Sequence, residues 1–211
     1  MAFTLVILCF FVLFVVYPLF LIMYQSVVDP VNHQLTLDYF TKFFGRKFYW
    51  STLVNSFSVT ICSTLLAALI GLPMAYLLRS YKIPASKYVN ILIVISYLSP
   101  PFIGAYAWIQ LLGRNGFITQ LINQLPGIHF GGIYGFAGIV LVFSLQSFPL
   151  IYMYVSGALK NMDSSLNEAA ESLGCGAFDR VRQIILPLVM PSLLAGSLLV
   201  FMRVFSDFGT P

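Results

Sequence analysis

Few side chains in this sequence could do acid–base or metal chemistry, and those few are scattered. His33 and His129 stand far apart, and neither has carboxylates or cysteines nearby at a metal-binding spacing. Cys9, Cys62 and Cys175 fit neither a metal site nor a disulfide framework. The sequence also lacks a Gly-rich loop followed by Lys that would cradle a nucleotide. We therefore predict no catalytic residue and no metal or cofactor bound by this chain, which argues against a membrane-embedded enzyme.

The best-organised polar segment is residues 163–187. Ser165 and Glu168 have the spacing of a capping box, so a short helix should begin there. Gly174 stands where a left-handed C-cap is expected, and a second helix is predicted over residues 177–185. Pro187 cannot continue that hydrogen-bond ladder, so it should mark the start of the next apolar segment.

These two short helices have a small apolar face with a charged rim. Glu171 and Arg180 should face water, whereas Ala170, Leu173 and Phe178 should not. Such a face suits docking into the groove of a partner protein. It equally suits an amphipathic loop that folds on its own membrane domain, and the pattern alone leaves both interpretations open.

The composition places these segments in a membrane protein. The chain is 59% hydrophobic and 9% charged, against about 25% charged residues in soluble domains. The net charge of +4 is small and dispersed, and no basic cluster interleaved with aromatics appears, so we expect no nucleic-acid partner. Lipid is the natural surrounding of so apolar a chain, and its paired backbone favours helices.

Five segments are long enough to cross the hydrocarbon core as helices. They are residues 2–23, 53–78, 88–111, 135–157 and 188–206. The first is too long for a signal peptide and has no cleavage site, so we interpret it as a retained helix. The predicted fold class is all-α, a polytopic membrane helical bundle.

Basic residues favour a cytoplasmic position for the loops 79–87 and 158–187, and hence for the N-terminus. Residues 29–50 are then external, and their many aromatic rings predict an amphipathic element at the membrane interface.

Polar or helix-breaking residues within the spans are candidates for a translocation path. Pro100 and Pro101 should kink the third span, and such breaks often line a path. Arg203 and Asp207 are four residues apart, hence on one helix face, and could line the path or form an ion pair near the outer interface. Gln110 and Gln146 are further path candidates, or else hydrogen-bonding links between helices.

One motif in the polar segment resembles a known family. Glu168-Ala169-Ala170, then Gly174, Ile184 and Leu186-Pro187, are similar to the signature of binding-protein-dependent ABC importer permeases of the MetI-like superfamily. The resemblance implies that residues 163–187 form the coupling loop, which inserts into an ATPase subunit. It implies as partners an ATPase dimer that binds ATP and Mg, an external substrate-binding protein, and a second permease half, either a homodimer mate or a fused half. It also implies a bacterial inner membrane location.

The resemblance extends to a substrate group. Residues 99–108, 111–116 and 206–211 look like permeases of the ferric iron importer group, which implies iron transport. Permeases for thiamine, sulfate, polyamines or aminophosphonates share parts of these segments. A secondary transporter or channel is a further alternative, but it leaves the signature unexplained.

The expected organisation has three parts. Residues 1–28 form the N-terminal transmembrane helix, residues 29–50 the periplasmic amphipathic loop, and residues 51–211 the permease domain. Related permease halves have six core spans and this sequence predicts five, so we expect the domain to be incomplete at its C-terminal end.

Overall fold

The computed structural model is built almost entirely of helices. It describes residues 2–29, 32, 34–81, 83–125, 131–163, 170, 172 and 174–207, with the backbone alone for Ala2, Pro101 and Phe102. Four helices in this part are long and apolar enough to cross a membrane, and a bent pair raises the number to five. Within the same ranges the only extended pairing is an isolated bridge between Val28 and Leu35. The predicted all-α membrane fold is confirmed.

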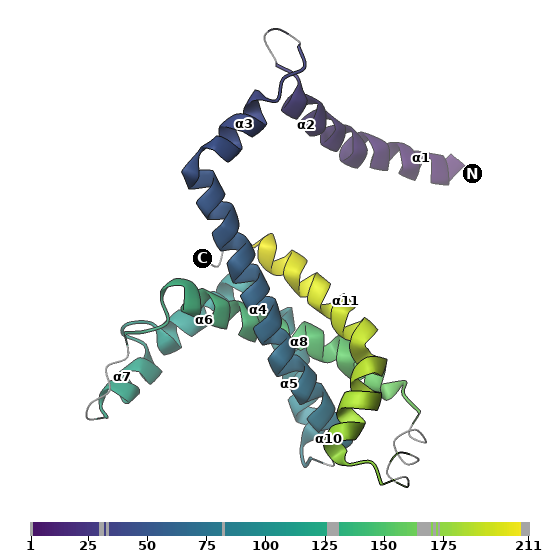
Figure 1. Ribbon diagram of the computed structural model, residues 1–211, viewed down its shortest axis with the longest axis vertical. Helices are drawn as coiled ribbons and strands as arrows, with labels where there is room; N and C mark the ends of the chain where they lie inside the picture. The colour runs from purple at the N-terminus through teal and green to yellow at the C-terminus, as the bar shows by residue number, and fades with distance from the viewer. Residues whose placement is uncertain are drawn as a thin grey trace. The chain divides into compact units, whose positions relative to one another are not determined.

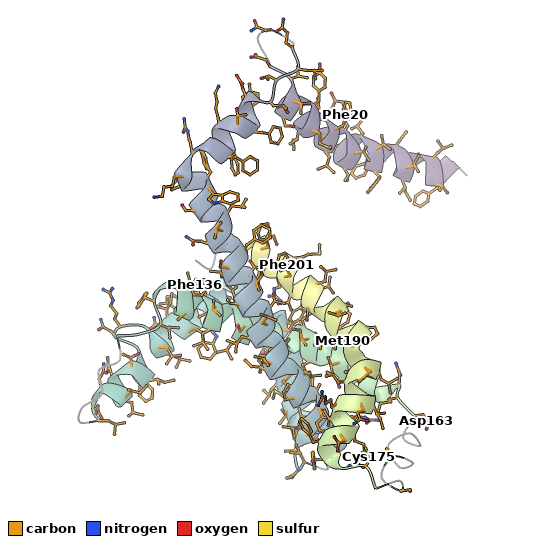
Figure 2. The ribbon with its side chains drawn as sticks, in the orientation of Figure 1. Phe20, Phe136, Asp163, Cys175, Met190 and Phe201 are labelled. Atoms are coloured by element: carbon orange, nitrogen blue, oxygen red, sulfur yellow. The ribbon has the colours of Figure 1, made fainter. Side chains whose placement is uncertain are left out.

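The chain divides into two compact units, Met1–Asn55 and Ser56–Pro211. The first unit opens with a continuous helix made of α1 (Ala2–Phe11), the π turn η1 (Val12–Val16) and α2 (Tyr17–Val27). The most apolar window of this helix has 0% of its residues buried, and Phe20 projects outward from it with 63% of its surface exposed (Figure 2). A helix that is apolar on every face belongs in lipid, as expected for the first span.

The predicted amphipathic element follows that helix. Beyond the bridge, α3 (Asp38–Gly45) is a short helix, and α4 (Lys47–Ser80) begins two residues after it. α4 therefore starts six residues before the predicted second span, at residue 47 rather than 53. Its 34 residues extend across the boundary into the second unit.

The second unit is organised around α8 (Gly135–Lys160), the most buried span, with 56% of its apolar window inside the protein. α8 packs against α5 (Ser86–Leu98) and α11 (Leu186–Phe205) (Figure 1). The other helices of the unit are α6 (Pro101–Leu112), α7 (Phe117–Asn123) and α10 (Ala177–Arg180). The largest fully buried aliphatic side chains among the described residues are Ile151, Val155, Val189 and Val200.

Small residues let α4 approach α8 closely. The hydroxyl of Ser63 donates to the Val140 carbonyl at 3.4 Å, and the hydroxyl of Ser144 donates to the Ser63 carbonyl at 3.1 Å. Further along α4, a Cβ on Gly71 would lie 3.0 Å from the Phe148 carbonyl oxygen. Direct hydrogen bonds and close backbone approach are how helices associate where the surrounding lipid is as apolar as they are.

The third predicted span is a broken pair of helices instead of one kinked helix. α5 ends at Leu98, Ser99 and Pro100 are extended, and α6 begins at Pro101. The axes on either side of the break differ by 110°. The prediction of a kink at Pro100 and Pro101 is confirmed, but the prediction of a continuous span over 88–111 is wrong. A proline lacks the N–H that the ladder needs, and the residue before it avoids helical geometry, so two adjacent prolines end the helix.

The fifth span is longer at its start than predicted. α10, the π turn η2 (Val181–Ile185) and α11 form one helix from Ala177 to Phe205, of 29 residues. Both π turns of the described chain stand just before a proline, η1 before Pro18 and η2 before Pro187. In this wider turn an N–H donates to the carbonyl five residues earlier instead of four, as the Leu186 N–H does to the Val181 carbonyl. The helix thus passes a residue that cannot donate, without a break.

Candidate functional site: the polar loop and the broken span

The first helix of the polar loop ends as the sequence predicted. Gly174 has φ +78°, in the left-handed region that favours glycine. The N–H of Cys175 donates to the carbonyl of Ala170 at 3.0 Å. This six-to-one bond around a left-handed residue is the Schellman motif. Ala170, 7% exposed, is held against the protein by this turn. The predicted cap at Gly174 is confirmed, whereas Ser165, Glu168 and Ala169 lie outside the described residues.

The second helix of the loop is rigidly connected to the membrane. Gly176 precedes α10, and from Ala177 onward the helix runs through η2 into α11 without interruption. Ile184 is half-buried in the π turn, and Pro187 is exposed one residue into α11. A force applied to α10 is therefore transmitted directly to the fifth span.

The base of this continuous helix packs on the other spans. Ile185 and Leu186 line an apolar cavity of about 160 Å³ with Val189 of α11. The remaining lining comes from α4 and α8, through Leu72, Pro73, Tyr76 and Leu159, and from Val181 of the π turn. In the first turn of the helix the ring of Phe178 is 75% exposed. The helix therefore begins with an exposed aromatic ring and packs on the other spans about two turns later.

A larger cavity lies beside the break between α5 and α6. Its volume is about 600 Å³. The polar side chains that line it are Ser96, Ser99 and Gln146, and the rest of its lining is apolar, including Trp108. Among the residues that the structure describes, no charged side chain is part of this lining. The structure therefore places one predicted path residue, Gln146, at the break that Pro100 and Pro101 create.

Gln146 packs against α6 at Gly104. A Cβ on Gly104 would lie 2.9 Å from Nε2 of Gln146, so a larger residue there would displace the amide. Nε2 is buried and has no hydrogen-bond partner among the described residues. A buried amide donor without a partner costs free energy, of order 1–3 kcal/mol. This donor is available to a solute or water in the cavity.

Arg203 and Asp207 are separated by the end of α11. The guanidinium of Arg203 lies 4.7 Å from the centroid of the Tyr97 ring, which stands near the end of α5. α11 ends at Phe205, and Asp207 lies beyond it with its N–H bonded to the Val204 carbonyl at 3.3 Å. The prediction that both charges share one helix face is wrong, because the helix ends before the second of them.

Gln110 lies apart from the two cavities and from Arg203. It is exposed on α6, and its Nε2 donates to the hydroxyl of Tyr106 one turn earlier, at 2.7 Å. It lines neither cavity described above. The structure therefore brings Gln146 and Arg203 to the α5 side of the bundle and leaves Gln110 apart from them.

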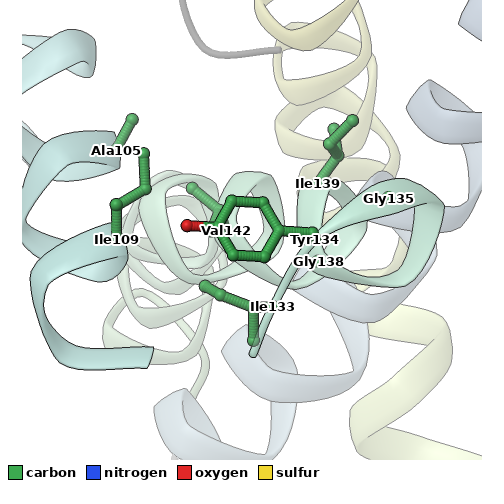
Figure 3. Close-up of a pocket in the computed structure, with 8 residues that line it drawn as sticks. All are labelled: Ala105, Ile109, Ile133, Tyr134, Gly135, Gly138, Ile139 and Val142. Carbon is green, nitrogen blue, oxygen red and sulfur yellow. The ribbon is translucent and has the colours of Figure 1, made fainter. Parts of the chain in front are cut away.

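A third cavity, of about 270 Å³, separates α6 from the start of α8 (Figure 3). Figure 3 shows the Tyr134 side chain crossing it, with the hydroxyl directed toward Ala105 and Ile109. Arg114 lies over the Tyr134 ring, 5.3 Å from its centroid. The other lining side chains are apolar, so this space offers little chemistry of its own.

Sequence reasoning missed two polar links between spans. Tyr97 was not singled out, and no periodic signal joins it to Arg203 of α11. The second link is a hydrogen bond from the Tyr152 hydroxyl of α8 to Oδ1 of Asn90 of α5. An Asn within an apolar segment was a visible signal for that link, since such an amide needs a partner in lipid. Among the described residues no group of three or more His, Cys, Asp or Glu gathers to hold a metal.

The structure thus has a multi-pass helical membrane domain, with a capped polar loop that leads straight into its last described span. The comparison of sequences assigns its class. Residues 67–211 match the family described as "Binding-protein-dependent transport system inner membrane component". The chain therefore belongs to this family, the permease subunits of ABC importers.

The names of individual relatives refer to different substrates. The molybdenum transport system permease protein ModB of Haemophilus influenzae is 32% identical over 159 residues, which cover 75% of this chain and 69% of ModB. The ferric transport system permease protein FbpB of Actinobacillus pleuropneumoniae is 25% identical over 209 residues, 99% of this chain and 30% of FbpB. The sulfate transport system permease protein CysT of Salmonella typhimurium is 26% identical over 170 residues, 76% of this chain and 60% of CysT.

Solved structures share the fold. A bacterial alginate ABC transporter, in complex with a periplasmic protein bound to an alginate pentasaccharide, superposes with a TM-score of 0.72 at 15% sequence identity. The match covers 99% of this chain and 76% of that one. The similarity shows that the chain shares the helical fold of that ABC transporter chain.

Proposed function

We propose that this chain forms one permease half of an importer that receives ferric iron from an external binding protein and releases it into the cytoplasm. The energy comes from ATP, bound with Mg on a separate ATPase dimer. The proposal keeps the sidedness expected from the basic residues, with residues 158–187 on the cytoplasmic side. A second permease half, a homodimer mate or a fused half, completes the path.

The observation that carries the ATPase coupling is the course of the chain from Gly174 to Phe205. The left-handed turn at Gly174 orients the two parts of the loop, and the second part is one rigid helix with the fifth span. Closure of a docked ATPase dimer would tilt α10, and α11 would tilt with it. α8 packs on α11, so both spans would move and change the side to which the path opens.

Iron is supported by the extent of one similarity. The ferric permease FbpB matches over 99% of this chain, a probable sulfate permease of Marchantia polymorpha over 92%, and ModB of Haemophilus influenzae over 75%. The segments that resemble the ferric group include residues 99–108, which form the break and the start of α6.

A tetrahedral oxyanion is the second candidate, and one observation favours it. Within the described part of the chain, the cavity at the break has no acidic side chain in its lining, and the amide Nε2 of Gln146 has no hydrogen-bond partner. Neutral donors suit the oxygens of molybdate or sulfate better than they suit a bare trivalent cation, which prefers anionic oxygen ligands.

Uptake assays separate the two candidates. Cells that express the importer are given radiolabelled ferric iron, molybdate or sulfate, and a strain with the permease deleted is the control. The proposal predicts permease-dependent accumulation of iron alone. Accumulation of molybdate or sulfate in its place would establish the second candidate, and accumulation of none of the three would contradict both.

A further inference from the structure

The short helix α3 has two chemically distinct faces. At about 100° per residue, its four aromatic residues fall within an arc of about 140°. They are Tyr39, Phe40, Phe43 and Phe44, between 38% and 55% exposed. Asp38 lies opposite this arc, and Thr41 and Lys42 flank its two edges. A helix of 8 residues cannot span a bilayer, so its apolar face is suited to lie along one.

Aromatic pairs join this face to the first turn of α4. Phe43 stacks on Tyr49 with ring centroids 5.0 Å apart, and Phe44 meets Trp50 at 6.3 Å. The chain turns between these pairs at Arg46, which is extended. The two helices therefore present one continuous aromatic surface, and the two ring pairs hold the angle between them.

Three cations border this surface, Lys42, Arg46 and Lys47, and all are exposed. No ion pair joins them to a carboxylate in the part of the chain that the structure describes. One acidic residue, Asp38, lies in α3, at the far end from Arg46. The corner thus carries an excess of positive charge beside exposed rings.

The length of α4 indicates how deep this corner lies in the membrane. Its 34 residues extend about 51 Å, at about 1.5 Å per residue. The hydrocarbon core is about 30 Å thick, so at least one end of α4 must stand in the headgroup region. Aromatic rings settle at that level, and Phe48, Tyr49 and Trp50 gather in the first turn of α4. Phosphate groups are the anions found there.

We propose that the corner from Lys42 to Trp50, the basic–aromatic corner, binds the phosphate of an anionic phospholipid such as phosphatidylglycerol. Lys42, Arg46 and Lys47 attract the phosphate, and the rings of Phe43, Phe44, Tyr49 and Trp50 lie among the upper acyl chains. The bound lipid holds α3 in the membrane plane and sets the depth of α4. The proposal concerns lipid binding by this corner and does not depend on the transported substrate.

The two tryptophans of the chain, Trp50 and Trp108, make matched reporters. Trp108→Phe leaves Trp50 in the corner as the one fluorophore, and Trp50→Phe leaves Trp108 in the other unit. Each full chain is reconstituted into phosphatidylcholine vesicles that contain a minor fraction of phosphatidylglycerol with brominated acyl chains, which quench tryptophan. Quenching beyond the bulk fraction measures local enrichment of the anionic lipid.

Trp50 should report enrichment, and the triple variant K42Q/R46Q/K47Q should reduce it toward the bulk value, by about fivefold in lipid affinity for each charge removed. Quenching of Trp108 should match the bulk fraction of the anionic lipid in the vesicles. K87Q removes one exposed cation elsewhere and should leave Trp50 quenching unchanged. About 1 M salt should reduce the enrichment as screening requires.

Two results would overturn the proposal. The first is bulk-level quenching of Trp50 in the unsubstituted corner, or enrichment that the triple variant retains. The second is a change in Trp50 fluorescence on adding the binding protein, without any preference for the anionic lipid, which would assign the corner to that protein.

Discussion

Gly71 of α4 lies directly against Ile151 of α8, so that a Cβ on the glycine would stand 3.1 Å from Cβ of the isoleucine. Ile151 is fully buried, and its Cα is 3.5 Å from the position of a Cβ on Gly196 of α11. One residue of the central helix is thus flanked by a glycine from each neighbouring span. This contact fixes the spacing of the three helices at the centre of the bundle.

Gly71→Val should lower thermal stability, because the Phe148 carbonyl 3.0 Å from the new Cβ is backbone and cannot move aside alone. Overpacking of this kind costs about 1–3 kcal/mol. Gly157→Val is the matched control, since it is also in a helix interior but has nothing within 4 Å of its Cβ. Thermal unfolding in detergent checks the pair. Equal melting temperatures for the two variants would show that the close contact is not limiting.

The turn at Gly174 depends on backbone conformation and not on space. Its φ is +78° and nothing lies within 4 Å of a Cβ there. A β-branched side chain is strained in this region, whereas Asn tolerates it. We expect Gly174→Val to reduce ATP-driven uptake at least tenfold with normal membrane levels, from strain of about 1–3 kcal/mol, and Gly174→Asn to retain most of it.

Gly176→Ala is the control for the same loop. Gly176 has φ −63°, and its Cβ would meet only Oδ2 of Asp179 at 3.6 Å, so alanine fits. Its uptake should match that of the unsubstituted chain. If Gly174→Val transports normally, the left-handed turn has no part in coupling.

The stacking of Arg203 on Tyr97 links α11 to the end of α5. Cation–π pairs contribute about 0.5–2 kcal/mol to stability, and the contribution increases as the pair is shielded from water. Tyr97→Phe keeps the ring and should be near neutral, whereas Tyr97→Leu and Arg203→Gln should each destabilise the bundle. A double-mutant cycle in thermal stability measures the coupling directly. Additive losses, with no coupling between the two residues, would refute the interaction.

The π turn before Pro187 should depend on that proline. In Pro187→Ala the restored N–H allows ordinary four-residue hydrogen bonding, and η2 should become α-helical. Removing a one-residue expansion rotates α10 about the helix axis by about 100° relative to α11. The variant should fold and reach the membrane but hydrolyse ATP without matching uptake. The ratio of ATP hydrolysed to substrate transported tests this, and an unchanged ratio would contradict it.

Several features of this molecule followed from local sequence. The spans follow from apolar length, the break from Pro100 and Pro101, and the turn from Gly174, because each depends on neighbours along the chain. The 110° angle at the break did not follow, since hydropathy averages over composition and carries no direction. The continuity of α10 with α11 was also missed, because a π turn lets the helix pass Pro187 where a break was expected.

Contacts between residues far apart in the sequence could not be predicted from it. Tyr97 meets Arg203, and Asn90 meets Tyr152, across separations that no helical period connects. Asp207 was placed on a helix face because it lies four residues after Arg203, but α11 ends at Phe205. Helical periodicity assigns a residue to a helix face only if the helix extends as far as that residue. The position of the helix end depends on tertiary packing.

We propose that the loop of residues 163–187 docks an ABC ATPase, and co-purification in gentle detergent tests this docking most directly. The unsubstituted chain should retain the ATPase subunit, and Glu168→Lys, at the charged position of the signature motif, should lose it at least tenfold. Asp38→Lys, a charge reversal of the same size on α3, should retain it in full. Retention of the ATPase by Glu168→Lys at the unsubstituted level, or its absence from every sample, would contradict the account.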